Sequence, residues 1–328
     1  MKAILCERLG PPDTLIYRTD LPDPNPGAGE VVIAVESAGV NFPDILVIQG
    51  LYQFRPELPF SPGGEVAGTI AKVGAGVTHW QVGDRVAYMS LTGGFRSHVV
   101  ARAEALMPVP ETLPLTTMGG LVLTYGTAMH GLRQRANVQA GETVLVLGAA
   151  GGVGLAAVEI AKAMGATVIA AASTQEKLET AKTAGADHVI NYAQTDLRRA
   201  LKDLMGRMGK TGVDVVVDPV GGDLLEPALR ACGWGGRYLI IGFASGSIPK
   251  IPANLPLLKG CSVVGVFWGD FRLRDVAADN ANFDQIFAWL AQGKLTPLIS
   301  HQFPLKDAPK ALQMISARQA QGKIILLP

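Results

Sequence analysis

A glycine-rich segment in the middle of the chain has the residue types and spacing of a dinucleotide-binding turn. Gly148, Gly151, Gly152 and Gly154 follow the apolar segment Thr143–Leu147 and precede a helical pattern. Glycines let a backbone turn tightly and approach a pyrophosphate, which the first N–H groups of the following helix then bind. The spacing G-x-x-G-G-x-G departs from the strict dinucleotide pattern and is weak evidence by itself. The strand before it and the helix after it favour a dinucleotide-binding turn over the alternative, a turn used only for packing.

The end of the next apolar segment, Thr167–Ala172, indicates which dinucleotide is bound. NAD sites have an acidic residue about 20 residues after the turn, where it binds the ribose 2′-hydroxyl. Here Ser173 and Thr174 follow instead, and Lys177 lies one helical turn later. Hydroxyls and a positive charge suit a 2′-phosphate, so we expect NADPH. In the alternative, Ser173 only caps a helix through the S-x-x-E pattern and Lys177 is an exposed surface residue. The missing acid carries most of the argument.

The histidines and cysteines show no spacing that would bind a metal. No two of the five histidines lie three or four residues apart, and none is near a cysteine. Cys6, Cys232 and Cys261 are widely separated and include no C-x-x-C pair. We therefore expect no metal site and no disulfide framework, which indicates a reduced, cytoplasmic setting.

The elements around these candidates predict two kinds of domain. Residues 1–107 contain short strands separated by glycine and proline turns, as in an irregular, partly barrel-like β domain. After Pro108, Pro110 and Pro114, apolar strands alternate with helices, which indicates a doubly wound parallel sheet covered on both faces. The expected strands are Glu30–Glu36, Val66–Val73, Asp84–Tyr88, Thr143–Leu147, Thr167–Ala172, Val189–Ile190, Val213–Val217, Arg237–Ile241, Val263–Phe267 and Lys323–Leu327.

The length also favours two domains in an α/β fold. The chain has 328 residues, and single cores stop growing at about 250–300. The segment after Val263–Phe267 is too short to be a domain, so we expect it to rejoin the N-terminal one. The β-rich domain is then discontinuous, at residues 1–120 and 270–328, and residues 121–269 form the Rossmann-type nucleotide-binding domain.

Composition excludes several classes of protein. The chain is 48% hydrophobic and 17% charged, which is enough apolar material for a core and unlike a disordered chain. Its net charge of +1 lacks the basic excess of a nucleic-acid-binding domain. The N-terminus has no signal-peptide pattern, and the longest uncharged apolar stretch, Thr143–Val158, is shorter than the ~20 residues of a membrane span. We therefore expect neither a nucleic-acid nor a membrane partner.

An ordered set of motifs along the whole chain then resembles a known family. The motifs are Ala38–Asp44, Gly50–Tyr52, Pro62–Gly68, Gly148–Gly154, Asn191–Tyr192, Asp218–Gly222 and Gly322–Lys323. They are similar to those of the zinc-independent NADPH:quinone oxidoreductases, the zeta-crystallin group of the medium-chain dehydrogenase/reductase superfamily. The segment from Asn41 to Glu65 most resembles its quinone oxidoreductase-like protein 2 branch. The resemblance implies that the β-rich domain is GroES-like and catalytic.

The resemblance also assigns candidate residues. It implies that Asn41 lies at the nicotinamide ribose and the acceptor, with Asp44 and Tyr52 as further catalytic candidates. The cofactor-binding candidates that it implies are Asn41, Thr124, Gly151, Gly152, Val153, Ser173, Lys177, Tyr192, Gly242, Phe243, Phe267, Trp268, Arg318 and Lys323. For Asn41 and Asp44 the alternative is a polar turn, and for Phe267 and Trp268 it is core packing.

The resemblance also bears on whether the protein binds zinc and on which class of substrate it acts. Zinc-dependent alcohol dehydrogenases of the superfamily have Cys at the place of Asn41 and His at the place of Gly64. Without a Lewis acid to polarise an alkoxide, alcohol oxidation loses its main support. We therefore expect a reductase that transfers hydride from NADPH to an electrophilic acceptor, a quinone first of all.

Two other interpretations stay open. The first is an enone or enoyl-thioester reductase, because Tyr52 matches the place of a catalytic tyrosine in related enoyl-thioester reductases; otherwise Tyr52 only lines the cleft or packs. The second is an NADPH-responsive binding or structural protein of crystallin type, although the net charge offers no basic surface for RNA.

Finally, we expect a homodimer. The predicted last strand of the parallel sheet, Val263–Phe267, carries no charge, and the following stretch with its five charged residues is no obvious cover. An uncovered edge strand is a liability, and pairing it across a two-fold axis satisfies its backbone groups. The resemblance implies the same assembly.

Overall fold

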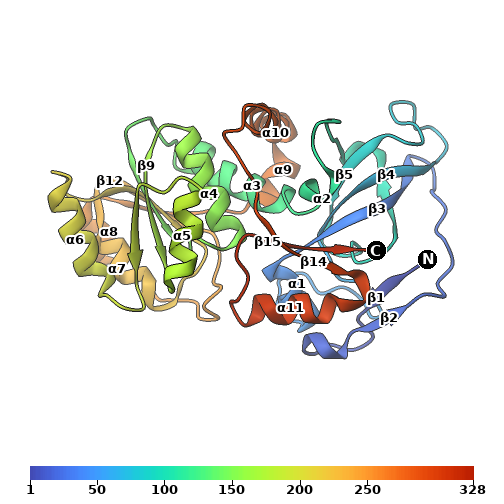
Figure 1. The fold of residues 1–328 in the computed structure, drawn as a ribbon, viewed down its shortest axis with the longest axis horizontal. Coiled ribbons are helices and arrows are strands. Elements are labelled where there is room, and N and C mark those ends of the chain that lie inside the picture. Colours follow the sequence, from blue (N-terminus) through green and yellow to red (C-terminus); the bar gives the residue numbers. More distant parts are fainter. The chain divides into compact units, whose positions relative to one another are not determined.

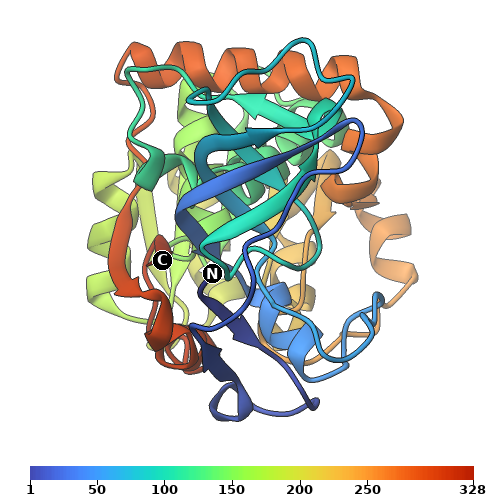
Figure 2. The same ribbon diagram turned by 90° about the vertical axis from the view of Figure 1, so that its right-hand side faces the viewer.

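The chain divides into two compact units in a computed structural model that describes residues 1–328. Unit 1 comprises residues 1–123 and 298–328, and unit 2 comprises residues 124–297. The chain therefore crosses from one unit to the other twice, and both termini belong to unit 1 (Figures 1 and 2). No helix combines the length and the apolar character that a membrane span requires.

Unit 2 is built on a six-stranded, entirely parallel sheet with the order β10-β9-β8-β11-β12-β13. Its central strands are continuous runs of buried Val, Leu, Ile and Ala, as expected for a sheet covered on both faces. The strands are β8 (Thr143–Leu147), β9 (Thr167–Ala172), β10 (His188–Asn191), β11 (Val213–Asp218), β12 (Cys232–Ile240) and β13 (Ser262–Gly265).

Helices cover both faces of this sheet. Figure 1 shows α4 (Gly152–Ala163) and α5 (Gln175–Thr183) on one side of the strands, with α6 (Leu197–Arg207), α7 (Leu225–Arg230) and α8 (Asn254–Lys259) on the other. α3 (Val122–Met129) begins in the last two residues of the N-terminal part of unit 1 and continues into unit 2. The remaining helices of unit 2 are the π-helix η3 (His130–Arg135), α9 (Trp268–Arg274), α10 (Val276–Ala291) and the short η4 (Gly222–Leu224). The strand order and the alternation of strand and helix confirm the predicted doubly wound fold.

Unit 1 is β-rich and mainly antiparallel. Its seven-stranded sheet has the order β14-β15-β3-β4-β5-β7, with β6 also paired to β3. These strands are β3 (Glu30–Val40), β4 (Glu65–Val73), β5 (Arg85–Met89), β6 (His98–Arg102), β7 (Leu106–Pro108), β14 (Ile299–Pro304) and β15 (Lys323–Leu327), while β1 (Ala3–Leu5) pairs with β2 (Ile16–Arg18). Three α-helices, α1 (Phe42–Ile48), α2 (Leu115–Met118) and α11 (Ala308–Ser316), and the short η1 (Pro12–Thr14), η2 (Ala103–Ala105) and η5 (Leu305–Asp307) complete the unit. The return of the C-terminal segment brings β15 into the interior of this sheet.

The chain returns to unit 1 later than expected, at residue 298 and not at residue 270. The reason is that α9 and α10 are bound to the start of unit 2. The rings of Phe271 and His130 stack with centroids 4.0 Å apart. The side chains of Arg133 and Gln134 donate to Asn282 Oδ1 at 3.2 and 2.9 Å. The edge strand of the parallel sheet, β13, begins one residue earlier than expected and ends two residues earlier, so Val266 and Phe267 lie outside it and Phe267 directly precedes α9.

Candidate active site

A buried ion pair lies in unit 1 where three strands come together. Lys323 begins β15, Glu65 begins β4, and Asn41 directly follows β3, which lies between those two strands. Lys323 Nζ is 2.7 Å from Glu65 Oε1 and 2.5 Å from Asn41 Oδ1. The two charged side chains are only 6% and 0% exposed. A pair this far from water persists only where further hydrogen bonds satisfy both charges.

Those further bonds are present, and they orient Asn41. Glu65 Oε1 accepts from Asn41 Nδ2 at 2.9 Å, and Glu65 Oε2 accepts from the backbone N–H of Leu123 at 2.8 Å. Lys323 Nζ also donates to the carbonyl of Val40 at 3.2 Å. The second amide proton of Asn41 has only a long contact of 3.4 Å with the carbonyl of Gly39. The ion pair therefore fixes the Asn41 amide and leaves it one weakly used donor.

Asp44 lies in the first turn of α1, next to this pair. Its Oδ2 accepts the backbone N–H of Asn41 at 2.8 Å, and the side chain is buried. Burial raises the pKa of Asp44 to about 7, although the hydrogen bonds from Asn41 and Gly63 and the charge of Lys323 oppose the rise. Near neutral pH the Asp44 carboxyl group can therefore be either protonated, and release a proton, or ionised, and accept one.

Tyr52 follows α1 in the loop and packs, half-buried, against the core of unit 1. Burial raises the pKa of Tyr52, and the negative charge of Asp44 raises it further. Unit 1 thus brings the three predicted catalytic residues, Asn41, Asp44 and Tyr52, into one region, while their roles remain predictions.

The glycine-rich turn of unit 2 has the geometry that a pyrophosphate needs. Gly148 adopts φ +58°, and a Cβ atom on Gly154 would lie 2.3 Å from the carbonyl oxygen of Gly148. Gly151 precedes α4 and supplies no side chain to cap it. The first N–H groups of this 12-residue helix, at Gly152 and Val153, have no capping side chain and can meet an anion. The turn therefore fits a dinucleotide.

The ends of β9 and β10 place the predicted 2′-phosphate residues side by side. The backbone N–H of Tyr192 donates to the carbonyl of Ala172 at 3.1 Å. The alternative in which Ser173 caps α5 is wrong, because Thr174 has the extended conformation of the cap and its Oγ1 accepts from the N–H of Lys177 at 3.3 Å. The half-buried Ser173 hydroxyl is therefore not used by the helix, and no acidic side chain lies at this strand end.

Gly242 and Phe243, two other predicted cofactor residues of unit 2, lie at the same edge of the sheet. Gly242 and Phe243 follow β12, where the N–H of Gly242 is 3.4 Å from the carbonyl of Asp218 at the end of β11. Thr124 is 2% exposed in the first turn of α3. The residues after β8, β9, β11 and β12 all lie at the carboxyl ends of parallel strands, where such sheets bind ligands.

The structure gives different surroundings to the two aromatic candidates and to the arginine. Trp268 is 3% exposed, and its Nε1 donates to Asp279 Oδ1 at 2.7 Å. This buried contact with Asp279 favours the alternative of core packing for Trp268, and a role of Trp268 at the cofactor remains a prediction. Phe267 is 63% exposed at the start of α9. Arg318 lies in unit 1 with φ +57°, in the turn after α11, and its role remains a prediction.

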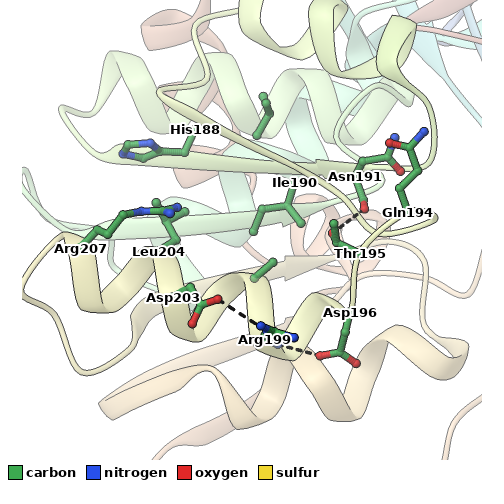
Figure 3. Close-up of a pocket in the computed structure, with 12 residues that line it drawn as sticks. His188, Ile190, Asn191, Gln194, Thr195, Asp196, Arg199, Asp203, Leu204 and Arg207 are labelled. Atoms are coloured by element: carbon green, nitrogen blue, oxygen red, sulfur yellow. Dashed lines mark hydrogen bonds and ion pairs between the residues drawn. The ribbon is translucent and has the colours of Figure 1, made fainter.

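A groove of about 630 Å³ lies between β10 and α6, away from most of these residues (Figure 3). Its walls are mainly polar, with His188 and Arg207 at one end and Asn191 and Thr195 at the other. Asn191 is the one member of the family motifs that lines it. The groove therefore does not coincide with the predicted site.

No group of three or more His, Cys, Asp or Glu side chains is arranged to hold a metal ion. At the place of Gly64, a Cβ atom would lie 3.3 Å from the carbonyl oxygen of Ser90 and 3.9 Å from Asp44 Oδ1. Zinc independence of the protein remains a prediction that rests on Asn41 and Gly64.

Comparisons with known proteins agree with this arrangement. Residues 27–111 match the family model of the alcohol dehydrogenase GroES-like domain, and residues 152–290 match that of the zinc-binding dehydrogenases. The chain is 38% identical over 327 residues to the quinone oxidoreductase-like protein 2 homolog of Nematostella vectensis, covering 99% of this chain and 88% of that protein. The chain belongs to the quinone oxidoreductase-like family of the medium-chain dehydrogenases/reductases.

Solved structures extend the match to the whole fold. The crystal structure of Escherichia coli quinone oxidoreductase complexed with NADPH is 30% identical, with a TM-score of 0.91 and full coverage of both chains. The CurK enoyl reductase structure is 28% identical, with a TM-score of 0.88, covering 99% of this chain and 98% of that one. These matches confirm the predicted family, fold class and oxidoreductase class, and the E. coli complex agrees with the NADPH prediction.

The central position of Glu65 in the site of this quinone oxidoreductase-like chain was not predicted from the sequence. Glu65 appeared there only as part of the motif Pro62–Gly68. Its partners Asn41, Leu123 and Lys323 lie 24, 58 and 258 residues away in the sequence. A signal was nevertheless present, because a lone acidic residue at the start of an apolar strand requires a buried partner.

Proposed function

We propose that the protein transfers hydride from NADPH to an electrophilic acceptor, with quinones as the principal substrate class. The observation that carries this proposal is the buried Asn41 amide, which Lys323 and Glu65 orient and which retains one weakly used N–H donor. A donor of fixed direction can stabilise the negative charge that develops on a reduced carbonyl oxygen. The glycine turn and the acid-free end of β9 supply the site for NADPH.

Each part of the chain has a defined task in this reaction. NADPH, when bound, supplies the hydride. Gly151, Gly152 and Val153 bind the pyrophosphate through backbone N–H groups, while Ser173 and Lys177 bind the 2′-phosphate. Asn41 donates to the acceptor oxygen, and Asp44 holds a proton that it can release near neutral pH.

The alternative acceptor is an enone or an enoyl thioester. Two observations support it: the half-buried position of Tyr52 against the core that α1 shares, and the similarity to the CurK enoyl reductase. In that reaction the Tyr52 hydroxyl would protonate the carbon next to the carbonyl after hydride arrives, and Asp44 would influence the proton affinity of Tyr52.

Tyr52→Phe separates the two acceptor classes. If Tyr52 is the proton donor, enone and enoyl-CoA reduction should fall by the ~10²–10⁴-fold that is typical of a general acid. Quinone reduction should change little, because water can protonate a reduced oxygen. We expect only a small effect on both substrates, measured as NADPH oxidation with quinones, enones and crotonyl-CoA. A large loss confined to the enones would make the alternative the principal function.

We infer that the protein acts as a homodimer. β13 is the edge strand of the parallel sheet and pairs only with β12. Large apolar side chains are exposed near its start: Trp234 (86%), Leu257 (79%) and Leu258 (71%). Trp234 packs over Gly260, two residues before β13. A second copy that pairs with β13 would satisfy the edge and cover these side chains. A cytoplasmic location also remains our proposal, supported by the low cysteine content.

A further inference from the structure

A buried carboxylate interrupts the apolar face of α4, the helix that begins at the glycine turn. Glu159 is 5% exposed, whereas its buried neighbours Val158, Ile160 and Ala161 are aliphatic. Burial raises the pKa of Glu159, although hydrogen bonds from Tyr125 and Thr296 oppose the rise. Burying a carboxylate is unfavourable unless several donors compensate for the lost water, so the partners of Glu159 indicate what it does.

Those partners come from the two segments by which the chain enters and leaves unit 2. Tyr125 lies just after the crossing at residues 123 and 124, and its hydroxyl donates to Glu159 Oε2 at 2.5 Å. Thr296 lies just before the crossing at residues 297 and 298. Its N–H and its hydroxyl donate to Glu159 Oε1 at 3.2 and 3.3 Å. One carboxylate therefore binds both crossings, with one oxygen for each.

The other side of each crossing is held in unit 1 by a residue of the ion pair, by the carboxylate of Glu65 at one crossing and by the backbone N–H of Lys323 at the other. Glu65 Oε2 accepts from the N–H of Leu123, and the N–H of Lys323 donates to the carbonyl of Leu298 at 2.8 Å. Each crossing therefore has one fixed residue on either side, only two positions apart. Lys323 and Glu65 also bind each other. The chain segments 123–125 and 296–298 therefore form a closed ring, joined by Glu159 in unit 2 and by the Lys323–Glu65 pair in unit 1.

We propose that Glu159 couples the two crossings and so acts as a positioning residue for hydride transfer. Glu159 lies seven residues after Gly152, about 10 Å along a rigid helix from the N–H groups that meet the pyrophosphate. The ring therefore connects the cofactor-binding end of α4 to the residues that orient Asn41. The catalytic consequence rests on the function proposed above, whereas the coupling itself does not.

Hydrogen exchange tests the coupling without any substrate. Tyr125→Phe removes the donor of the first crossing and Thr296→Val removes one donor of the second. We expect either variant to speed amide exchange at both crossings by about fivefold, the effect of one lost hydrogen bond. Changes confined to the mutated crossing, or no change, would overturn the coupling. Glu159→Gln, which keeps one acceptor oxygen, should exchange more slowly than Glu159→Ala.

Steady-state kinetics test the positioning role. Small displacements of reacting groups can cost up to ~10²-fold in rate, so Tyr125→Phe should lower kcat for quinone reduction by about 10- to 100-fold with the Kd for NADPH unchanged. Tyr238→Phe is the matched control, because the Tyr238 hydroxyl donates to Asp218 Oδ2 at 2.6 Å in the same unit but away from both crossings. Both variants should lose similar thermal stability, and only Tyr125→Phe should lose kcat.

The possible outcomes separate the two proposals. An equal loss of kcat in Tyr125→Phe and Tyr238→Phe, or no loss in either, contradicts the positioning role of Glu159. If the wild type reduces no acceptor, the proposed function has failed, and the exchange measurements still decide whether Glu159 couples the crossings.

Discussion

Removing the ammonium group of Lys323 should strongly destabilise unit 1. In Lys323→Met the side-chain volume is nearly kept, but Glu65 remains fully buried with no cation within reach. The two hydrogen bonds from Asn41 and Leu123 persist and offset part of the loss. Breaking a buried pair by removing one partner costs about 3–5 kcal/mol, and we expect a value in this range for unit 1.

The matched control is Lys310→Met in the same unit. Lys310 Nζ lies 3.1 Å from Asp307 Oδ1, but the two side chains are 68% and 25% exposed. Exposed pairs of this kind contribute about 0–1 kcal/mol, so this variant should be nearly neutral. The contrast tests whether burial, and not the presence of an ion pair, determines the loss.

The assay should report on unit 1 alone, because a chain with two units need not unfold in one step. Urea dependence of hydrogen exchange at β3 and β15 gives the free energy of opening that sheet. Adding Glu65→Gln to Lys323→Met should recover part of the loss, since a neutral amide needs no cation. A loss in Lys323→Met below about 1 kcal/mol, comparable with that of Lys310→Met, would refute the reasoning.

Lys177→Ala should raise the Kd for NADPH by roughly 10- to 150-fold, because one contact to the 2′-phosphate is lost. The Kd for NADH should be nearly unchanged. Equal affinity of the wild type for NADPH and NADH in a titration would contradict this prediction. Because the folded pKa of Asp44 is raised to about 7, its contribution to stability is complete below about pH 4 and is lost as the pH rises through 7. Asp44→Asn should therefore flatten the pH dependence of the urea midpoint between those values, and an unchanged slope would count against the raised pKa. Val264→Lys places a charge on the edge strand β13 and should shift a dimer toward monomer or aggregate; light scattering that finds a wild-type monomer at micromolar concentration, or a normal dimer in the variant, would defeat the dimer proposal.

Local patterns in the sequence were enough to predict several strands of both sheets. Thr143–Leu147 and Thr167–Ala172 in the parallel sheet, and Lys323–Leu327 in the sheet of unit 1, are strands with the predicted bounds. Apart from Lys323, each is an apolar or β-branched run next to a glycine or a polar turn, so local preference and burial agree. The glycine turn was predictable for the same reason, because its glycines, strand and helix are contiguous.

The features that the sequence did not predict depend on contacts between distant residues. The segment of α9 and α10 contains Asp279 and Asn282, which look exposed in the sequence but are buried against Trp268 and Gln134. The late return to unit 1 follows from these polar contacts, which no hydrophobic pattern reveals. Glu159 was missed for the same reason, since Tyr125 and Thr296 lie 34 and 137 residues away.

The position of β15 inside the sheet of unit 1 also has a consequence for biosynthesis. β15 pairs with β14 and with β3, of which β3 is synthesised early and β14 late. Lys323, the first residue of β15, supplies the only cation that contacts Glu65. Unit 2 is contiguous, from residue 124 to 297, and can fold while the ribosome is still adding the rest. Until residue 327 has been synthesised, the N-terminal 123 residues lack strand β15 in their sheet and lack the cation that pairs with Glu65. Although its first strands are synthesised first, the β-rich unit is therefore the last part of the nascent chain to become native.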